Sequence, residues 1–169
     1  KTNKKGDFIL YINPDKHKGL EIFERIAKEL PEKNFLVVGK KDYKPKSDNV
    51  FVDGYVDDRK EIFAKARLLL APSIFPDPHP RVVIEAMANG IPCIVSGRGG
   101  LTEEAENAGI IIKDIFNIKE WTEAIKQFDD KTFYNKMSKL SEDKAAEFED
   151  TRQFAKFDLL LYKLFPNFS

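Results

Sequence analysis

The sequence predicts an α/β protein with a Rossmann-like, doubly wound parallel sheet of six strands, helices on both faces and a helical C-terminal tail. Short apolar runs, typical of strands buried on both faces, alternate along the chain with segments whose apolar residues recur at helical spacing. Turn formers such as Pro, Gly and Asn follow these runs, as expected where a strand leaves its sheet. The 169 residues suffice to bury a core, so residues 1–169 are interpreted as one domain.

The first part of the chain predicts three strands and two helices. The run at 8–12 is the first strand, and a loop follows it at 13–19. From Leu20 to Leu30 the apolar residues recur at helical spacing, so we expect a helix with one buried face, which Pro31 stops. The remaining elements are strands at 35–38 and 51–56, followed by a helix that Asp57 or Asp58 caps and that turns Ile62, Phe63 and Ala66 inward.

The stretch 67–104 has the strongest pattern. The apolar run at 68–71 predicts a buried strand that ends in a loop. That loop, at 74–80, contains three prolines at alternate positions and is therefore expected to hold one shape. A helix at 81–89 follows, and Gly90 is placed to end it. Next come a strand at 93–95, a glycine-rich loop at 96–100 and a helix near Leu101.

The last part of the chain predicts one strand, at 109–112, and then only helices. The first of these helices has Trp121, Ala124, Ile125 and Phe128 on one face. The segment 132–150 is charged and alanine-rich with few large apolar residues, which predicts a surface helix. A more apolar stripe from Phe154 to Leu164 is expected to cover the sheet, and the family resemblance described below implies the alternative that it crosses onto a partner domain.

The composition excludes several classes of function. Because 28 Lys and Arg residues balance 28 Asp and Glu residues, charge gives no reason to expect a nucleic-acid or anionic-membrane partner. The single cysteine, Cys93, cannot form an intramolecular disulfide or a cysteine cluster, and its apolar neighbours predict a small core residue. His17 and His79 lie far apart in the sequence, so no metal site is expected.

The sequence also bears on location and completeness. No apolar run approaches the roughly 20 residues of a membrane span, and no signal peptide is visible. Together with the single cysteine, these features predict a cytoplasmic protein. The chain starts at Lys1 rather than at a methionine, so we expect a fragment of a longer polypeptide.

Two acids, Asp77 and Glu85, are expected near one crevice, with seven residues between them. This pattern resembles the acid motif of retaining glycosyltransferases with the GT-B fold, the large family four. The surrounding letters agree, with APS at 71–73, EAMANGIP at 85–92 and GGLTE at 99–103. The chain departs from the family in having Asp77 for the usual Glu, and His79-Pro80 where an aromatic residue and Gly are common.

The resemblance implies that the chain is the C-terminal, donor-binding half of a two-domain GT-B enzyme. Such an enzyme moves a sugar, typically a hexose, from a nucleotide-diphosphate sugar to an acceptor hydroxyl in glycan or polysaccharide biosynthesis. No metal and no cofactor are expected. The acceptor would be bound by an N-terminal domain of the same polypeptide, which this chain does not contain, so the isolated domain is expected to be inactive. Any peripheral membrane contact would belong to that missing domain.

The resemblance also implies the site. Glu85 would accept hydrogen bonds from the ribose diol, Asp77 would face the sugar hydroxyls, and Lys18 would reach the diphosphate, so these three are the expected catalytic residues. In the family an Arg stands where this chain has Asn13. The glycine-rich loop and the helix after it would offer N–H groups to phosphate. The full predicted donor-binding set is Asn13, Lys18, Tyr55, Asp77, His79, Arg81, Glu85, Arg98, Gly99, Gly100 and Leu101.

Two alternatives remain. The departures at Asn13 and at His79-Pro80 are compatible with a nucleotide-sugar-binding or regulatory module that has lost transfer activity. A dinucleotide-dependent oxidoreductase is disfavoured because the first strand is not followed by the G-x-G-x-x-G turn. Taken singly, each assignment also has a structural reading, since Glu85 can stabilise the dipole of its own helix and Tyr55 can simply pack.

Overall fold

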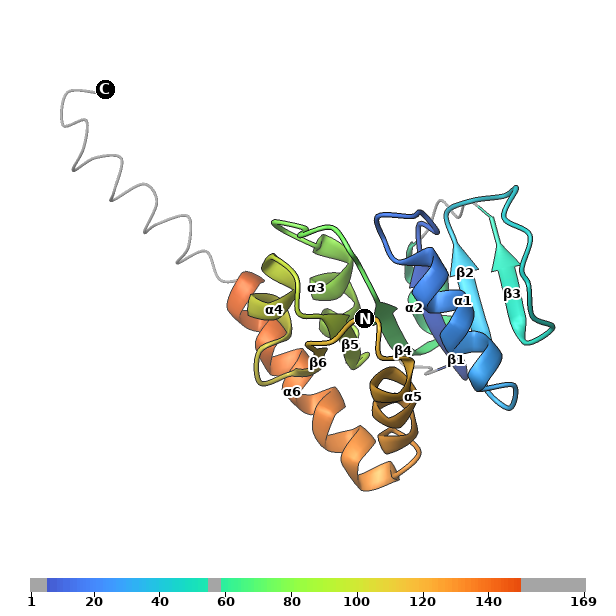
Figure 1. Ribbon diagram of the computed structural model, residues 1–169. Coiled ribbons are helices and arrows are strands. Elements are labelled where there is room, and N and C mark those ends of the chain that lie inside the picture. Colours follow the sequence, from blue (N-terminus) through green and yellow to red (C-terminus); the bar gives the residue numbers. More distant parts are fainter. Residues whose placement is uncertain (1–5, 55–58, 150–169) are drawn as a thin grey trace, which may run out of the picture.

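The computed structural model describes residues 6–54 and 59–149, which form one six-stranded parallel sheet with helices on both faces (Figure 1). The strand order is β3-β2-β1-β4-β5-β6, so the predicted doubly wound sheet is confirmed. The direction of winding reverses between β1 and β4, and ligands of such sheets bind at the carboxyl ends of the strands beside that point. The strands are β1 (Phe8–Ile12), β2 (Phe35–Val38), β3 (Val50–Asp53), β4 (Ala66–Ala71), β5 (Cys93–Ser96) and β6 (Gly109–Ile112).

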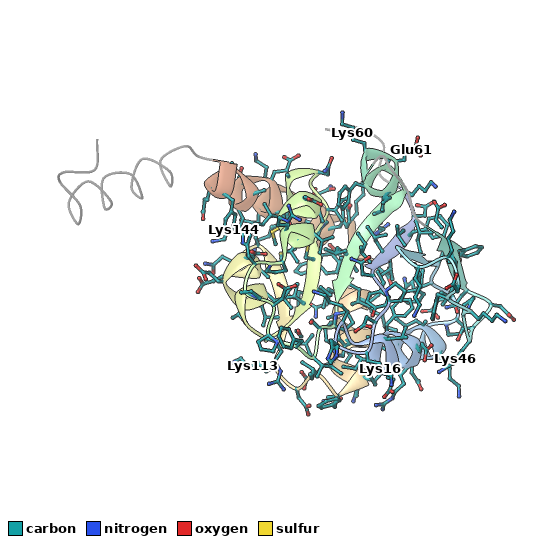
Figure 2. The ribbon with its side chains drawn as sticks, turned by 90° about the horizontal axis from the view of Figure 1, so that it is seen from above. Lys16, Lys46, Lys60, Glu61, Lys113 and Lys144 are labelled. Atoms are coloured by element: carbon teal, nitrogen blue, oxygen red, sulfur yellow. The ribbon has the colours of Figure 1, made fainter. Side chains whose placement is uncertain are left out.

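The helices divide between the two faces of the sheet. One apolar cluster joins the sheet to α1 (Leu20–Glu29) and α5 (Ile118–Gln127). The other joins it to α2 (Arg59–Lys65), α3 (Arg81–Ala88) and α4 (Gly100–Ala105). In the view from above, Lys60 and Glu61 mark α2 on the far side of the sheet from Lys16, which lies just before α1 (Figure 2).

Side chains alternate between the two faces along each strand, so each face of the sheet carries apolar side chains and is covered by helices. Ile9 and Tyr11 of β1 pack with α1 and α5, whereas Leu10 between them packs with the helices of the other face. All three side chains are buried. A strand that buries both faces reads as a continuous apolar run, which is why these runs were recognisable. The predicted core position of Cys93 is confirmed, since it is fully buried, and burial raises the pKa of its thiol.

The long helix α6 (Lys131–Glu149) corrects the expectation of a surface helix. It packs against α3 and has a buried face that includes Tyr134 and Met137. Ser138 donates a hydrogen bond to the carbonyl oxygen of Gly90 at 2.7 Å, and Ser141 donates one to that of Ala108 at 3.1 Å. Small hydroxyl side chains can be buried when they bond to backbone carbonyls, so few large apolar residues did not mean an exposed helix.

Three further expectations concern the ends of elements. The third strand stops at Asp53, short of the predicted 51–56, and Tyr55 lies outside the described residues. The predicted caps Asp57 and Asp58 and the apolar stripe 154–164 also lie outside them.

None of the described helices combines the length and apolarity needed to cross a membrane.

Candidate functional site

A cavity of about 320 Å³ lies beside the point where the strand order reverses. Its apolar lining comes from the ends of β1 and β2 and from α2 and α3. Polar residues from three separate loops and helices converge on it. Six members of the predicted donor-binding set line this one cavity: Asn13, Lys18, Asp77, His79, Arg81 and Glu85.

Lys18 and Asp77 form an ion pair across this cavity. The Lys18 Nζ atom lies 2.5 Å from Asp77 Oδ2, and the two side chains are 41% and 20% exposed. The hydrogen bond from Lys18 holds the pKa of the Asp77 carboxyl below its usual range. The structure therefore brings together the residues predicted to contact phosphate and sugar, and in this arrangement they neutralise each other.

The loop between β1 and α1 is shaped by Gly19, which precedes α1. Gly19 has a φ of +80°, and a Cβ atom there would lie 1.9 Å from the carbonyl oxygen of Pro72. Only glycine permits this approach of the loop to the end of β4. The carbonyl oxygen of His17 then accepts hydrogen bonds from the backbone N–H groups of Ile74 and Phe75 and from the hydroxyl of Ser73. These bonds position Lys18 opposite Asp77.

Asn13 occupies a backbone position that suits its type. Its φ is +57°, in the left-handed region where Asn is one of the better-tolerated residues. Its N–H donates to the carbonyl oxygen of Val38 at 2.8 Å. Its side-chain oxygen approaches Gly39 so closely that a Cβ atom there would lie 2.3 Å away. The cavity therefore receives an uncharged amide at this place.

Helix α3 places Glu85 and Arg81 on the cavity side. The two are four residues apart and so share one side of the helix, while Val83, Ala86 and Met87 are buried against the sheet side. Pro80 precedes the helix and is suited to that position by its fixed φ. Glu85 is half-buried and Arg81 is exposed. The two acids of the motif thus face the same cavity, as the spacing predicted.

The glycine-rich loop packs against the loop that carries Asp77. The Gly100 N–H donates to the carbonyl oxygen of Asp77 at 2.7 Å, so it is not available to a phosphate here. Cβ atoms at Gly99 and Gly100 would lie 2.7 Å and 2.5 Å from the carbonyl oxygens of Asp77 and Pro78. The two glycines allow this loop to pack tightly on the loop that carries Asp77. Donor binding by Gly99 and Gly100 stays a prediction.

Arg98 and Leu101, two other described members of the predicted set, are not among the residues that line the 320 Å³ cavity. Arg98 is exposed. Leu101 is buried and lines a smaller cavity of about 70 Å³, which it shares with Asn13, Lys18 and Asp77. Tyr55 lies outside the described residues. Their donor-binding roles stay predictions.

Glu104 is a polar residue of this region that the sequence reasoning missed. Its side chain on α4 is 4% exposed, and Oε1 lies 2.9 Å from Nδ1 of His79. Its other oxygen, Oε2, has no hydrogen-bond partner among the described residues. Burial raises the pKa of Glu104 to about 7, and His79 opposes that rise. The available signal was helical spacing, because Leu101, Glu104 and Ala105 fall on one buried face.

Metal ligands do not cluster in the described part of the chain. Within residues 6–54 and 59–149, no group of three or more His, Cys, Asp or Glu side chains is placed to hold a metal ion. The polar groups of the cavity are instead suited to hydroxyls and anions: carboxylates accept from hydroxyls, and ammonium and guanidinium groups bind phosphate.

A family comparison matches most of the chain. The family described as "Glycosyl transferases group 1" matches residues 8–130, which include all six strands and the cavity. No curated protein sequence gives a significant match.

Several solved structures share the fold. Sucrose-phosphate synthase from Thermosynechococcus elongatus is 21% identical with a TM-score of 0.78, over 96% of this chain and 46% of that one. HepE from Anabaena, solved with UDP-glucose, is 19% identical with a TM-score of 0.76, over 89% and 48%. WaaG, a glycosyltransferase involved in lipopolysaccharide biosynthesis, is 22% identical with a TM-score of 0.70, over 84% and 44%. This chain therefore spans less than half the length of each of these three proteins.

Proposed function

The chain belongs to the group 1 glycosyl transferases, and from this premise we propose that it is the donor-binding domain of a retaining glycosyltransferase. Its fold is one half of the GT-B architecture. The proposed reaction moves a hexosyl group from a nucleotide-diphosphate sugar to an acceptor hydroxyl, in glycan or polysaccharide biosynthesis. The observation that carries the proposal is that Asp77, Glu85 and Lys18 line one cavity at the carboxyl edge of the sheet.

Each of these residues has a chemical role in the proposal. Glu85 accepts hydrogen bonds from the two ribose hydroxyls, since the two oxygens of a carboxylate match a diol. Asp77 accepts from the hydroxyls of the donor sugar. Lys18 and Arg81 line the cavity and bind the diphosphate in this proposal, and Lys18 exchanges its contact with Asp77 for one with phosphate when the donor binds.

The proposed catalysis is mainly electrostatic. Cations and N–H groups around the diphosphate stabilise the leaving group as its bond to the sugar breaks. The hydroxyl contacts of Asp77 hold the sugar in place. In retaining enzymes of this family the donor's own phosphate is thought to accept the acceptor proton. On this proposal neither a metal nor a cofactor is needed.

The rest of the proposal concerns the whole protein. An N-terminal domain of the same polypeptide would bind the acceptor, and the enzyme would work in the cytoplasm, with any peripheral membrane contact made by that domain. A nucleotide-sugar-binding or regulatory module is the second candidate. The observation that favours it is Asn13, which brings an amide to the cavity where the family's Arg would bring a charge.

Calorimetry with a panel of nucleotide sugars, beginning with UDP-glucose, tests the proposal. The wild-type chain should bind at least one of them. Glu85→Gln should keep the melting transition and weaken binding by roughly 1.5–3 kcal/mol, the range for a hydrogen bond to a charged group. Glu21→Gln is the matched control, because Glu21 is an exposed acid on α1 and does not line the cavity.

Two results contradict the proposal. One is that no nucleotide sugar of the panel binds the folded wild-type chain. The other is that Glu85→Gln binds the donor as tightly as the wild type while its melting transition is intact.

A further inference from the structure

The formal charges of the described Lys, Arg, Asp and Glu residues that line the cavity sum to zero, whereas the proposed ligand is an anion. Among its described lining residues, the acids Asp77 and Glu85 match the bases Lys18 and Arg81, and Lys18 is already paired with Asp77. A nucleoside diphosphate brings at least two negative charges. His79 is the remaining lining residue that can carry a positive charge.

Glu104 contacts the His79 ring at its Nδ1 atom. The carboxylate oxygen Oε1 lies 2.9 Å from Nδ1 of the ring, and the Glu104 side chain is 4% exposed whereas that of His79 is 63% exposed. With Nδ1 engaged by Glu104, the ring nitrogen left for a ligand is Nε2. Glu104 is thus buried and is not among the residues that line the cavity, whereas His79 contacts it and lines the cavity.

Burial makes the pair sensitive to charge on its ligand. An ionised carboxylate that is withdrawn from water is costly unless a cation compensates it, and the partner of Glu104 is His79. Burial raises the pKa of Glu104 to about 7, and the contact with His79 opposes that rise. A positive charge on the ring compensates Glu104 on one side and an anion beside Nε2 on the other.

Other titratable groups face the same pair. Asp77 from the same loop and Glu103 from α4 add negative charge near Glu104, and Cys93 from β5 is a buried thiol beside it. Lys18 faces Asp77, and Arg81 shares the cavity lining with His79. Of these groups, only Glu104 is in hydrogen-bond contact with the imidazole ring in the described residues.

We propose that His79 and Glu104 form a carboxylate–imidazole pair in which Glu104 is the positioning residue and His79 binds the diphosphate of the donor through Nε2. The proposal rests on the proposed function and deepens it, because it names a group that adds positive charge to that of Lys18 and Arg81 at the diphosphate. The position of His79 in the loop, two residues after Asp77, would bring both residues to the same donor.

Calorimetry on the full 169-residue chain tests the binding role. The probes are UDP, ADP, GDP and dTDP, each with its nucleoside, so that one binding diphosphate and its uncharged counterpart are compared. His79→Gln should weaken the diphosphate by roughly fivefold to tenfold, as expected for an exposed charged contact, and leave the nucleoside unchanged. Equal binding of the diphosphate by His79→Gln and by wild type overturns the proposal.

The pH profile tests the positioning role of Glu104. Titrations are compared at about pH 5.5 and about pH 7.2, on either side of the ordinary histidine pKa of about 6.5. Glu104→Gln keeps a hydrogen-bond acceptor but removes the charge. It should match wild type at the lower pH, where the wild-type Glu104 is itself mostly protonated because its pKa is raised to about 7, and bind the diphosphate roughly threefold to fivefold more weakly at the higher pH. Glu106→Gln, an exposed change just after the same helix that is not among the charges acting on Glu104, should match wild type at both.

An NMR measurement tests the pair without any ligand. The chain has two histidines, so His17→Gln assigns the ring signals of His79. In Glu104→Gln the His79 ring should lose its second proton at a lower pH than in wild type. Identical ring titrations in the two proteins overturn the positioning role. If Glu104→Gln does not fold, the exposed His79→Gln still decides whether His79 binds the diphosphate.

The outcomes separate this inference from the proposed function. If none of the diphosphates or nucleotide sugars binds the folded wild-type chain, both proposals fail. If wild type binds and Glu85→Gln weakens binding but His79→Gln does not, only the role of His79 fails. Weaker binding in both variants supports both proposals.

Discussion

At the scale of single residues, the pairing of Lys18 with Asp77 decides what each side chain can do. Two residues that were assigned to different parts of the donor lie 2.5 Å apart, in a cavity partly open to water. Each must therefore leave the other, at least in part, to contact a ligand. The pair keeps the carboxylate ionised, because the hydrogen bond from Lys18 holds the pKa of Asp77 below its usual range.

Replacing Asp77 should separate the phosphate contact from the sugar contact. Asp77→Asn releases Lys18 and removes a negative charge from the cavity, so UDP, or whichever nucleoside diphosphate binds, should bind roughly threefold to tenfold more tightly. The same variant should lose the preference for the nucleotide sugar over the bare diphosphate. The gain should shrink at high salt, because the pair is partly exposed and is screened over roughly 8–10 Å.

A double variant supplies the control. In Lys18→Ala the released cation is absent, so adding Asp77→Asn to it should give a much smaller gain, and calorimetry on the four proteins measures the coupling between the two residues. If Asp77→Asn alone binds the diphosphate more weakly than wild type, the pair does not restrain Lys18 as described.

At the scale of elements, three loops at the carboxyl edge are joined into one unit. The loop after β1 contacts the loop after β4 through the carbonyl oxygen of His17. The loop after β5 contacts the same segment through Gly100 and through Ser96, whose hydroxyl donates to the carbonyl oxygen of Ser73 at 2.6 Å. Cavity residues on different loops are therefore positioned together rather than independently.

Gly19 is the position where this unit tolerates least change. Gly19→Ala combines a φ of +80° with a Cβ atom 1.9 Å from a backbone oxygen, so it should destabilise the chain by roughly 2 kcal/mol or more in denaturant unfolding. Gly97→Ala is the matched control, because the nearest atom to its Cβ would be 3.4 Å away and its φ is not in the left-handed region. Equal stability of the two variants would show that the loop adjusts easily.

At the scale of the whole molecule, the chain matches less than half of its solved relatives. It spans 46% of the length of sucrose-phosphate synthase and 48% of that of HepE. Its described residues include the cavity that we propose binds the donor. We propose that the acceptor hydroxyl is bound by the N-terminal domain of the same polypeptide.

The purified 169-residue chain should therefore bind a nucleotide sugar without transferring it. The measurement is product formation with a range of acceptors, under conditions in which calorimetry shows that the donor is bound. Robust transfer by this chain alone contradicts the two-domain proposal. When the chain is joined to the N-terminal part of its own polypeptide, transfer should appear, and continued inactivity there favours the binding or regulatory module.

Local patterns in the sequence determined the strands of the sheet and the placement of Arg81 and Glu85 on one side of α3. Apolar runs at 8–12 and 68–71 predict strands buried on both faces, and such strands pair in parallel under helices on each side. Helical spacing placed Arg81 and Glu85 on one side of α3. These features follow from the backbone periods of 2 and 3.6 residues, which any short segment of sequence displays.

The tertiary structure alone decided which distant residues meet. Lys18 and Asp77 are 59 positions apart, and no local period relates them. The contact of His79 with Glu104 and the bond from Gly100 to Asp77 depend likewise on the strand order, which places the loops after β4 and β5 side by side. The burial of Ser138 and Ser141 depends on where α6 packs. Such contacts depend on close approach between separate segments, and a polar residue gives no sign in the sequence of whether its partner will be water, a backbone carbonyl or another side chain.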